Sequence, residues 1–221
     1  DVIVTIDKVV NATEDIAQSV KVKITDDDDP EPTVTLSTSV TSINENPAQT
    51  ATITATLSTA SGKDVTVNLG INGASTATAG LDYTTSGLQI VIPAGSLTGT
   101  ITLTSENDSL DEFLETVLVD IVGVTNGLES GTQQVSVDIL DDDPEPTVVL
   151  ESSATDIAEN GGTLTLTARL NAVSGRPVTV NLGFSGIAQG GGVDYSAAGQ
   201  IVIPAGQLTA TVVVTAIQDL L

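Results

Sequence analysis

Carboxylates are the residues of this sequence whose types and spacing are suited to chemistry. Residues 141–143 are three consecutive aspartates that follow an alternating, strand-like run, and residues 26–28 are three more in an equivalent place. Two unit charges 4 Å apart repel by about 4 kcal/mol at an effective dielectric near 20. Such runs are tolerated either where water solvates them or where a cation binds.

The overall composition narrows the function classes. The 221 residues include 29 Asp+Glu against 6 Lys+Arg, a net charge of −23, and no His or Cys. A nucleic-acid partner is not expected, because phosphate binding needs a basic face. The usual zinc ligands, disulfides and Ser/His or Cys/His catalytic sets are excluded. No run approaches the length of a membrane span and no signal peptide opens the sequence, so we expect no membrane insertion. Carboxylate oxygens alone favour Ca²⁺ or Mg²⁺.

Sequence motifs recur at a spacing of 113 or 114 residues. Asp-Pro-Glu-Pro-Thr-Val occurs at 29–34 and 143–148, and Val-Thr-Val-Asn-Leu-Gly occurs at 65–70 and 178–183. Internal repeats of this size indicate a tandem array of modules. The predicted parts are residues 1–29, the last two strands of one module; residues 30–143, a complete module; and residues 144–221, a module without its last strands.

Short runs of alternating apolar residues, separated by turns, fill the complete module. One is Thr-Ala-Thr-Ile-Thr-Ala-Thr-Leu at 50–57, which gives one polar and one apolar face. Seven such runs in about 110 residues predict an all-β fold of tandem immunoglobulin-like β-sandwich modules, joined head to tail. The predicted strands are 33–37, 50–57, 64–70, 88–92, 98–104, 113–122 and 132–140.

Strand direction predicts where the acidic residues meet. If successive strands run alternately up and down, the first, third and fifth loops and the end of the seventh strand lie at one pole. These segments carry Glu45, Asp82, Asp108, Asp111, Glu112, Glu115, Asp141, Asp142 and Asp143, whereas the opposite loops carry far fewer acids. Ca²⁺ accepts about six to eight oxygens in flexible geometry, so several loops can share ions.

The segment Glu-Asn-Asp-Ser-Leu-Asp-Glu-Phe-Leu-Glu at 106–115, followed by Ile-Leu-Asp-Asp-Asp at 139–143, resembles the Calx-beta domain family. That family carries Asp-x-x-x-Glu-x-x-Glu before its sixth strand and closes with Ile-x-Asp-Asp-Asp. The resemblance implies a sandwich that binds several Ca²⁺ ions at one pole. In the complete module it implies the ligands Glu45, Asp82, Asp108, Glu112, Glu115, Asp141, Asp142 and Asp143. The matching residues of the two incomplete sites are Glu159, Asp194 and Asp219, and Asp26, Asp27 and Asp28.

The acidic segments also have a simpler interpretation. A run of aspartates alone is more often a solvated turn that aids solubility. Residues 106–115 can be a strand entry with exposed acids around buried Leu110, Phe113 and Val117. We favour the ion site because the acids converge and lack cationic partners, Lys63 being the only basic residue of the complete module.

The first functional hypothesis is structural. Pro-Glu-Pro at 30–32 and 144–146 fixes the backbone after each acidic run, which makes a short, stiff joint. We expect a Ca²⁺-rigidified segment of a long extracellular rod or fibre, either an adhesin or matrix stalk or a filament shaft, secreted or at the cell surface. Its partners are neighbouring modules of the same array. Strand donation from residues 1–28 of one chain to another is a variant, and a piece of a longer array is the simpler alternative.

Two other function classes stay open. One is a protein- or carbohydrate-binding module that acts in adhesion. Sugar sites usually use aromatic platforms, and the chain has only 2 Tyr and 2 Phe. A glycan array or a pull-down would discriminate this class. The other is a glycoside hydrolase accessory region with paired carboxylates, a remote alternative because no aromatic groove is visible. An enzyme is therefore not expected, and turnover that is lost in Glu112→Gln would overturn this view.

Overall fold

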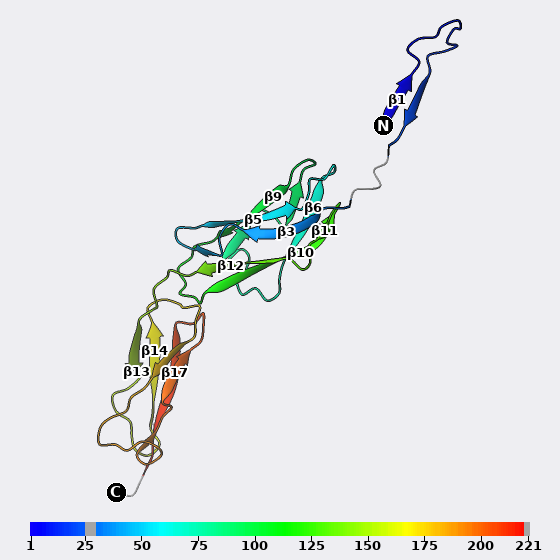
Figure 1. The fold of residues 1–221 in the computed structure, drawn as a ribbon. Helices are drawn as coiled ribbons and strands as arrows, with labels where there is room; N and C mark the ends of the chain where they lie inside the picture. Colours follow the sequence, from blue (N-terminus) through cyan, green and yellow to red (C-terminus); the bar gives the residue numbers. More distant parts are fainter. Residues whose placement is uncertain (25–29, 219–221) are drawn as a thin grey trace.

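The computed structural model of the protein describes residues 1–24 and 30–218. Figure 1 shows a β-hairpin followed by two β-rich units, in the order of the sequence. Within the described residues, no helix is long and apolar enough to cross a membrane.

The unit that follows the hairpin is a sandwich of two sheets. One sheet has the order β4–β12–β10–β6–β8, formed by Ser42–Asn44, Gln134–Leu140, Glu115–Thr125, Val65–Ile71 and Gln89–Ile92. The other has the order β11–β3–β5–β9–β7, formed by Leu128–Glu129, Thr33–Thr38, Thr50–Leu57, Thr98–Ser105 and Tyr83–Thr85. The predicted all-β sandwich is therefore confirmed.

All seven predicted strands of this unit are present, with ends that shift by at most three residues. The sequence did not reveal β4, β7 and β11, which have only two or three residues each. Such short strands are too brief to display an alternating pattern. They lie at the sheet edges, where β4 matters most for the site described below.

One continuous core joins the two sheets. Along β5, Ala51, Ile53 and Ala55 are buried while the threonines between them are only partly covered. They share a cluster with Val117 and Val119 of β10, on the facing sheet. Full burial of a Val or Ile side chain stabilises by about 1.5–3 kcal/mol. This core holds rigid the strands from which the acidic loops emerge.

The last unit repeats part of this architecture. One sheet has the order β13–β14–β18–β16, formed by Val148–Ser152, Thr163–Leu170, Thr209–Ala216 and Tyr195–Ser196. The other contains β15 and β17, Val178–Asn181 and Gln200–Ile203. Its core is smaller, with four buried residues at its centre: Ala168, Leu170, Ile201 and Ile203.

The hairpin at the beginning of the chain pairs β1 (Val2–Thr5) with β2 (Ser19–Val22) in antiparallel fashion. No residue of the described segment 1–24 is buried. The hairpin is therefore a strand pair without a core of its own.

Candidate metal centre

Glu45 is held at the pole by the short edge strand β4. This strand pairs in parallel with β12, with Ile43 opposite Ile139 and Asn44 opposite Leu140. The Glu45 N–H extends the pairing by donating to the Leu140 carbonyl oxygen at 3.2 Å. The residue is 5% exposed. A carboxylate from the first loop thus lies beside the end of the last strand.

Asp82 closes a tight turn between β6 and β7. Its N–H donates to the Thr78 carbonyl oxygen at 3.0 Å, and its Oδ2 accepts from the Thr78 N–H. Gly80 in this turn has a φ of +83°, which side chains other than glycine's rarely allow. The Asp82 carbonyl oxygen accepts from the Glu106 N–H at 2.9 Å, which ties the turn to the end of β9.

Two acidic segments, one between β9 and β10 and one after β12, are joined through backbone N–H groups. Asp108 Oδ1 accepts from the Leu110 N–H at 2.8 Å within the first segment. Asp141 Oδ2 accepts from the Glu112 N–H at 3.1 Å, and its Oδ1 accepts from the Asp143 N–H at 3.2 Å. Asp141 therefore connects the two segments at the pole.

The carboxylates form two groups of three, within each of which the ligand oxygens lie within 4.8 Å of one another. The first triad is Glu45, Asp108 and Asp143, and the second triad is Asp82, Glu112 and Glu115. Two further predicted ligands belong to neither triad: Asp141 is half-buried and bonds backbone, and Asp142 is exposed. The convergence predicted from strand direction thus agrees with the geometry, while ligation itself stays a prediction.

Burial and mutual repulsion raise the pKa of four of these acids, Glu45, Glu112, Glu115 and Asp143. Desolvation, followed by the charges of neighbouring carboxylates, raises the pKa of Glu45 to about 7. Desolvation, followed by a hydrogen bond with Asp82, raises the pKa of Glu115 to about 8. Desolvation is also the main cause that raises the pKa of Glu112 and of Asp143 above their usual values. The energetic cost falls as soon as a cation shares the site.

Glu115 indicates that the second triad suits a cation. Its Oε2 is buried and has no hydrogen-bond partner among the described residues. A buried polar atom without a partner costs about 1–3 kcal/mol. Both triads offer only oxygen ligands, which select hard cations, and carboxylates from separate loops suit the flexible coordination of Ca²⁺ better than the strict octahedron of Mg²⁺. The six triad carboxylates therefore fit Ca²⁺.

The Calx-beta domain family model matches residues 26–143 and residues 141–221. The chain belongs to the Calx-beta domain family. The two matches cover nearly the whole chain and correspond to its two β-rich units. None of the curated proteins compared with the chain matches it.

Solved structures with similarity to the chain include domains of Calx proteins. The calcium binding domain CBD12 of CALX1.1 is 17% identical, with a TM-score of 0.41, and the match covers 81% of this chain and 73% of that one. CBD12 from CALX1.2 is 17% identical, with a TM-score of 0.41 and coverages of 80% and 73%. The apo-form Calx CBD1 domain is 17% identical, with a TM-score of 0.39 and coverages of 50% and 99%. The family assignment rests on the family match.

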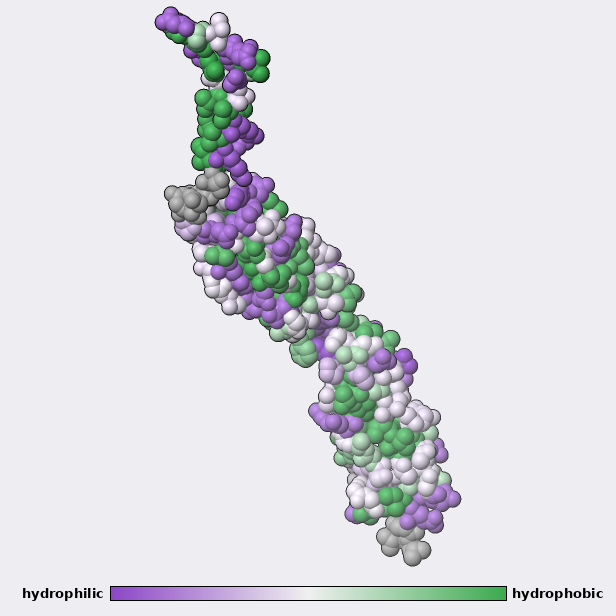
Figure 2. Space-filling model, turned by 90° about the vertical axis from the view of Figure 1, so that its right-hand side faces the viewer, coloured by the Kyte–Doolittle hydropathy of each residue, from purple (hydrophilic) through white to green (hydrophobic). Residues whose placement is uncertain are grey.

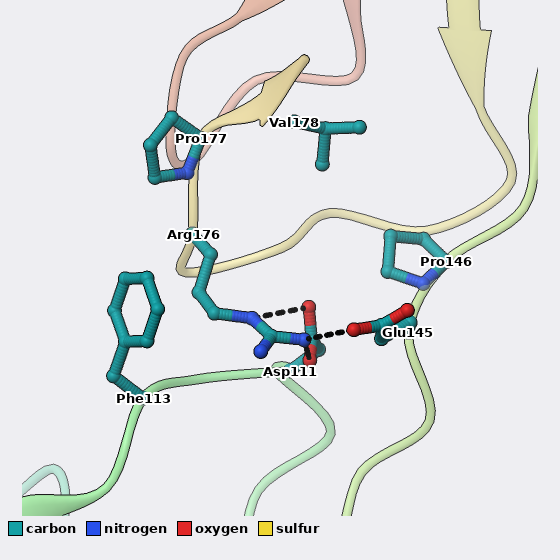
Figure 3. A pocket seen from close by; sticks show the side chains of 7 residues that line it. All are labelled: Asp111, Phe113, Glu145, Pro146, Arg176, Pro177 and Val178. Atoms are coloured by element: carbon teal, nitrogen blue, oxygen red, sulfur yellow. Dashed lines mark hydrogen bonds and ion pairs between the residues drawn. The ribbon is translucent and has the colours of Figure 1, made fainter. Parts of the chain in front are cut away.

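The expectation that the acids of the complete Calx-beta module lack cationic partners is wrong for Asp111. Asp111 is 4% exposed and forms an ion pair with Arg176 of the following module. Arg176 Nε donates to Asp111 Oδ2 at 3.1 Å, and Arg176 Nη2 donates to Asp111 Oδ1 (Figure 3). The Ser174 hydroxyl donates to Asp111 Oδ2 at 2.7 Å, and the Gly175 N–H donates to the Asp111 carbonyl oxygen at 2.9 Å. One aspartate thus docks a whole loop of the next module.

The simpler interpretation of residues 106–115, a strand entry with exposed acids, would bury Phe113, whereas Phe113 is 63% exposed. Its ring lies below the Arg176 guanidinium, whose central carbon is 5.4 Å from the ring centroid. Arg176 Nη2 also donates to Glu145 Oε1 at 3.1 Å (Figure 3). Phe113 is exposed because it faces the module junction, where Pro146, Pro177 and neighbouring side chains line a pocket, rather than the core.

Sequence reasoning placed Asp111 at the pole but missed its partner. A usable signal was the repeat of Ser-Gly-Lys at 61–63 as Ser-Gly-Arg at 174–176. Both loops fold alike, since Ser61 Oγ accepts from the Lys63 N–H at 3.0 Å and Ser174 Oγ accepts from the Arg176 N–H at 3.0 Å. A loop that recurs in both modules and carries a cation, placed against an acidic pole, indicates a docking element.

The predicted ligands in the other modules do not form a comparable carboxylate group among the described residues. Glu159 is exposed, and Asp194 is half-buried and accepts from the Gln189 N–H at 2.6 Å. Neither belongs to a carboxylate group like the two triads, within the residues that the structure describes. Four other predicted ligands, Asp26, Asp27, Asp28 and Asp219, lie outside the described residues.

Proposed function

We propose that this chain is a Ca²⁺-binding structural segment of an extracellular rod or fibre. In this proposal, ions at the pole of one Calx-beta module stiffen its junction with the next. The segment would serve as an adhesin or matrix stalk, or as the shaft of a filament, and would not act as an enzyme.

The observation that supports this proposal most is that the candidate ion site and the module junction share one segment. Asp111, which pairs with Arg176, directly precedes Glu112 of the second triad. The N–H of Glu112 is in turn held by Asp141, which lies just before the Pro-Glu-Pro joint. Cations that order the acidic segments would therefore also order the residues that hold the next module.

Charge repulsion gives the opposite behaviour without cations. Six triad carboxylates lie at one pole, and among the residues that the structure describes the only cation paired there is Arg176, on Asp111 and Glu145. Once ionised, the triads repel one another and favour looser loops. We expect Ca²⁺ to convert the junction from a loose state to a stiff one, since bound ligand stabilises the state that binds it.

Isothermal titration of CaCl₂ into the intact chain tests the ion site. Extracellular modules bind with Kd near about 10⁻⁴–10⁻³ M, and an ion at a hundredfold excess over Kd stabilises by about 2.7 kcal/mol. We expect saturable binding, a higher melting temperature in CaCl₂ than in EGTA, and a weaker response to MgCl₂. The absence of both heat and melting shift would refute the ion site.

Small-angle scattering tests the mechanical part of the proposal. In CaCl₂ the chain should give one narrow distribution of distances, and in EGTA a broader one, because the junction between the modules loosens. Identical profiles in both buffers, with binding established by titration, would separate ion binding from stiffening. Antibody labelling of intact, unpermeabilised source cells tests the surface location.

A further inference from the structure

Ser105, the last residue of β9, is buried in a chain whose serines and threonines mostly lie at or near the surface. Figure 2 shows many residues of intermediate hydropathy, the class of Ser, Thr and Gly, on the surface of the two β-rich units. Among the described residues only two serines are buried, and the other, Ser174, already holds Asp111 at the module junction. Ser105 is 1% exposed, so its hydroxyl must find its partners within the protein.

The Ser105 hydroxyl closes the loop that carries Glu45. It donates to the Asn44 carbonyl oxygen at 2.6 Å and accepts from the Gln49 N–H at 2.9 Å, at the two ends of residues 44–49. Gln49 Oε1 accepts in turn from the Asn44 N–H at 3.1 Å, so the two ends of the loop are also tied to each other. Glu45 directly follows Asn44, and its carboxylate belongs to the first triad. One hydroxyl of β9 therefore fixes the base of a loop that supplies a candidate ligand.

Ser105 also lies beside the turn that supplies the second triad. It is opposite Tyr83 in the β7–β9 pair, and Asp82 directly precedes Tyr83. The residue after Ser105 is Glu106, whose N–H donates to the Asp82 carbonyl oxygen at 2.9 Å. The end of β9 thus anchors one ligand loop of each triad, the Asp82 turn through backbone groups and the Glu45 loop through the Ser105 hydroxyl.

The last module shows that this strand position does not need a hydroxyl. Ala216 occupies the equivalent place in β18 and pairs with Tyr195, as Ser105 pairs with Tyr83. Its N–H donates to the Gly162 carbonyl oxygen at 2.8 Å, so the backbone bond to the first loop is kept and only the hydroxyl is missing. Ala216 is 8% exposed, which shows that an alanine can be buried here while the strand still pairs. The Ser105 hydroxyl is therefore available for a task other than closing the sandwich.

We propose that Ser105 is a positioning residue of the candidate ion site, whose hydroxyl fixes the loop of residues 44–49. This bond keeps the Glu45 carboxylate within 4.8 Å of those of Asp108 and Asp143, as the first triad requires. Residues that hold a metal ligand in place without touching the metal typically change its affinity by about 10–100-fold when they are mutated. The inference rests on the proposed function, because it concerns the same Ca²⁺ site.

Hydrogen exchange in EGTA tests the loop without any ion. Ser105→Ala removes the partner of the Asn44 carbonyl oxygen and of the Gln49 N–H at once, so the loop should open toward water to satisfy them. We expect the Gln49 N–H to exchange about tenfold faster than in wild type or more, because local opening becomes easier. The Glu106 N–H, which bonds to Asp82 instead, should exchange as in wild type. Unchanged exchange at Gln49 would overturn the proposal.

Isothermal titration with CaCl₂ measures the consequence for the ion. Ser105→Ala should bind Ca²⁺ about tenfold more weakly than wild type. The control is Ser86→Ala, which should bind like wild type: the Ser86 hydroxyl accepts from the Thr102 N–H at 2.9 Å beside the same β7–β9 pair but holds neither ligand loop. A wild-type chain that binds no Ca²⁺ would refute the proposed function itself. Equal binding by wild type and Ser105→Ala would refute only the role of Ser105.

A double-mutant cycle tests whether Ser105 acts through Glu45. Glu45→Gln already removes the charged ligand that the loop presents, so adding Ser105→Ala should weaken Ca²⁺ binding by less than about twofold further. A general loosening of the pole would instead lower the affinity by the same factor in both backgrounds. That additive result would reject Ser105 as the residue that positions Glu45.

Discussion

The acidic pole of the complete module and the equivalent end of the following module carry the same residue types at equivalent positions. Asp82 and Asp194 close similar turns, each accepting from a backbone N–H earlier in its own loop, four residues before Asp82 and five before Asp194. Glu45 and Glu159 are equivalent in sequence, yet Glu45 is buried and Glu159 is exposed. The turn aspartate is therefore placed by its own loop, and the glutamate is not.

The difference shows that the candidate site depends on long-range pairing. Glu45 reaches the pole because β4 pairs with β12, and the first triad is completed by Asp143 after β12. The second triad is completed by Glu112, just before β10, and by Glu115, the first residue of β10. The carboxylates of each triad are thus brought together by the pairing of strands that are distant in sequence, and the presence of acidic residues alone is not sufficient.

The largest effect should come from neutralising one member of the equivalent glutamate pair. In Glu45→Gln, we expect Ca²⁺ affinity to fall by about tenfold or more, or about 1.4 kcal/mol, because a buried charged ligand is lost. In EGTA the same variant should melt higher than wild type, since the repulsion on Glu45 disappears. Glu159→Gln is the matched control and should change neither property. Titration of both variants measures the Ca²⁺ affinity, and calorimetry measures the melting temperature. Equal effects in the two variants would contradict the difference in role that the burial of Glu45 and the exposure of Glu159 indicate.

The next effect concerns the docking loops of the two modules. Arg176→Ala leaves the buried carboxylate of Asp111 without its cation, although the Ser174 hydroxyl still donates to it, and should destabilise the junction by about 1 kcal/mol. Lys63→Ala removes the equivalent cation, which is exposed and makes no ion pair among the described residues, and should stay within about 0.5 kcal/mol of wild type. Thermal melting gives the stability, and small-angle scattering should show a wider spread of module orientations only for Arg176→Ala. If Arg176→Ala changed neither the melting temperature nor the spread of module orientations, the junction would not depend on the Asp111–Arg176 ion pair.

Much of this organisation was predictable from the sequence. Strand alternation and the internal repeat predicted the sandwich, because both patterns are local and occur more than once. The convergence of the acids followed from strand direction. The short strand β4, however, left no alternating pattern, and its pairing with β12 is what brings Glu45 beside Leu140.

The role of Asp111 could not be derived in the same way. Asp111 and Glu112 are adjacent acids, and no local pattern tells which of them faces the next module. Its partner Arg176 lies 65 residues away, so the pairing depends on how two modules meet. The grouping into two triads is equally nonlocal, because each triad combines carboxylates from separate loops.

A smaller effect is expected from pH. The pKa values of Glu45 and Glu115 are raised from 4.5 to about 7 and about 8. The folded state therefore holds protons that the unfolded state has already released. Without Ca²⁺, the stability from these groups is fully present below about pH 4.5 and is lost as pH rises through 7 to 8.

Calcium should weaken this trend, because the ion binds the deprotonated carboxylates and its affinity rises over the same pH window. Melting in EGTA should fall by several degrees between pH 5.5 and pH 8.5, and less in CaCl₂. The double variant Glu45→Gln/Glu115→Gln should flatten the EGTA profile. A wild-type profile in EGTA that rises with pH in this range would contradict the assigned burial effects.

The smallest effect separates the two acids that share Arg176. Glu145 lies 3.1 Å from Arg176 Nη2, but its side chain is 81% exposed, whereas that of Asp111 is 4% exposed. Exposed ion pairs contribute about 0.2–1 kcal/mol and are screened by salt. Glu145→Ala should therefore lower stability by less than about 0.5 kcal/mol, and Glu31→Ala, in the equivalent Pro-Glu-Pro joint, should have no effect. A double-mutant cycle of Glu145→Ala with Arg176→Ala measures the coupling. If the coupling exceeded 1 kcal/mol, the Pro-Glu-Pro joint itself, rather than the acidic pole, would hold the module that contains Arg176 in place.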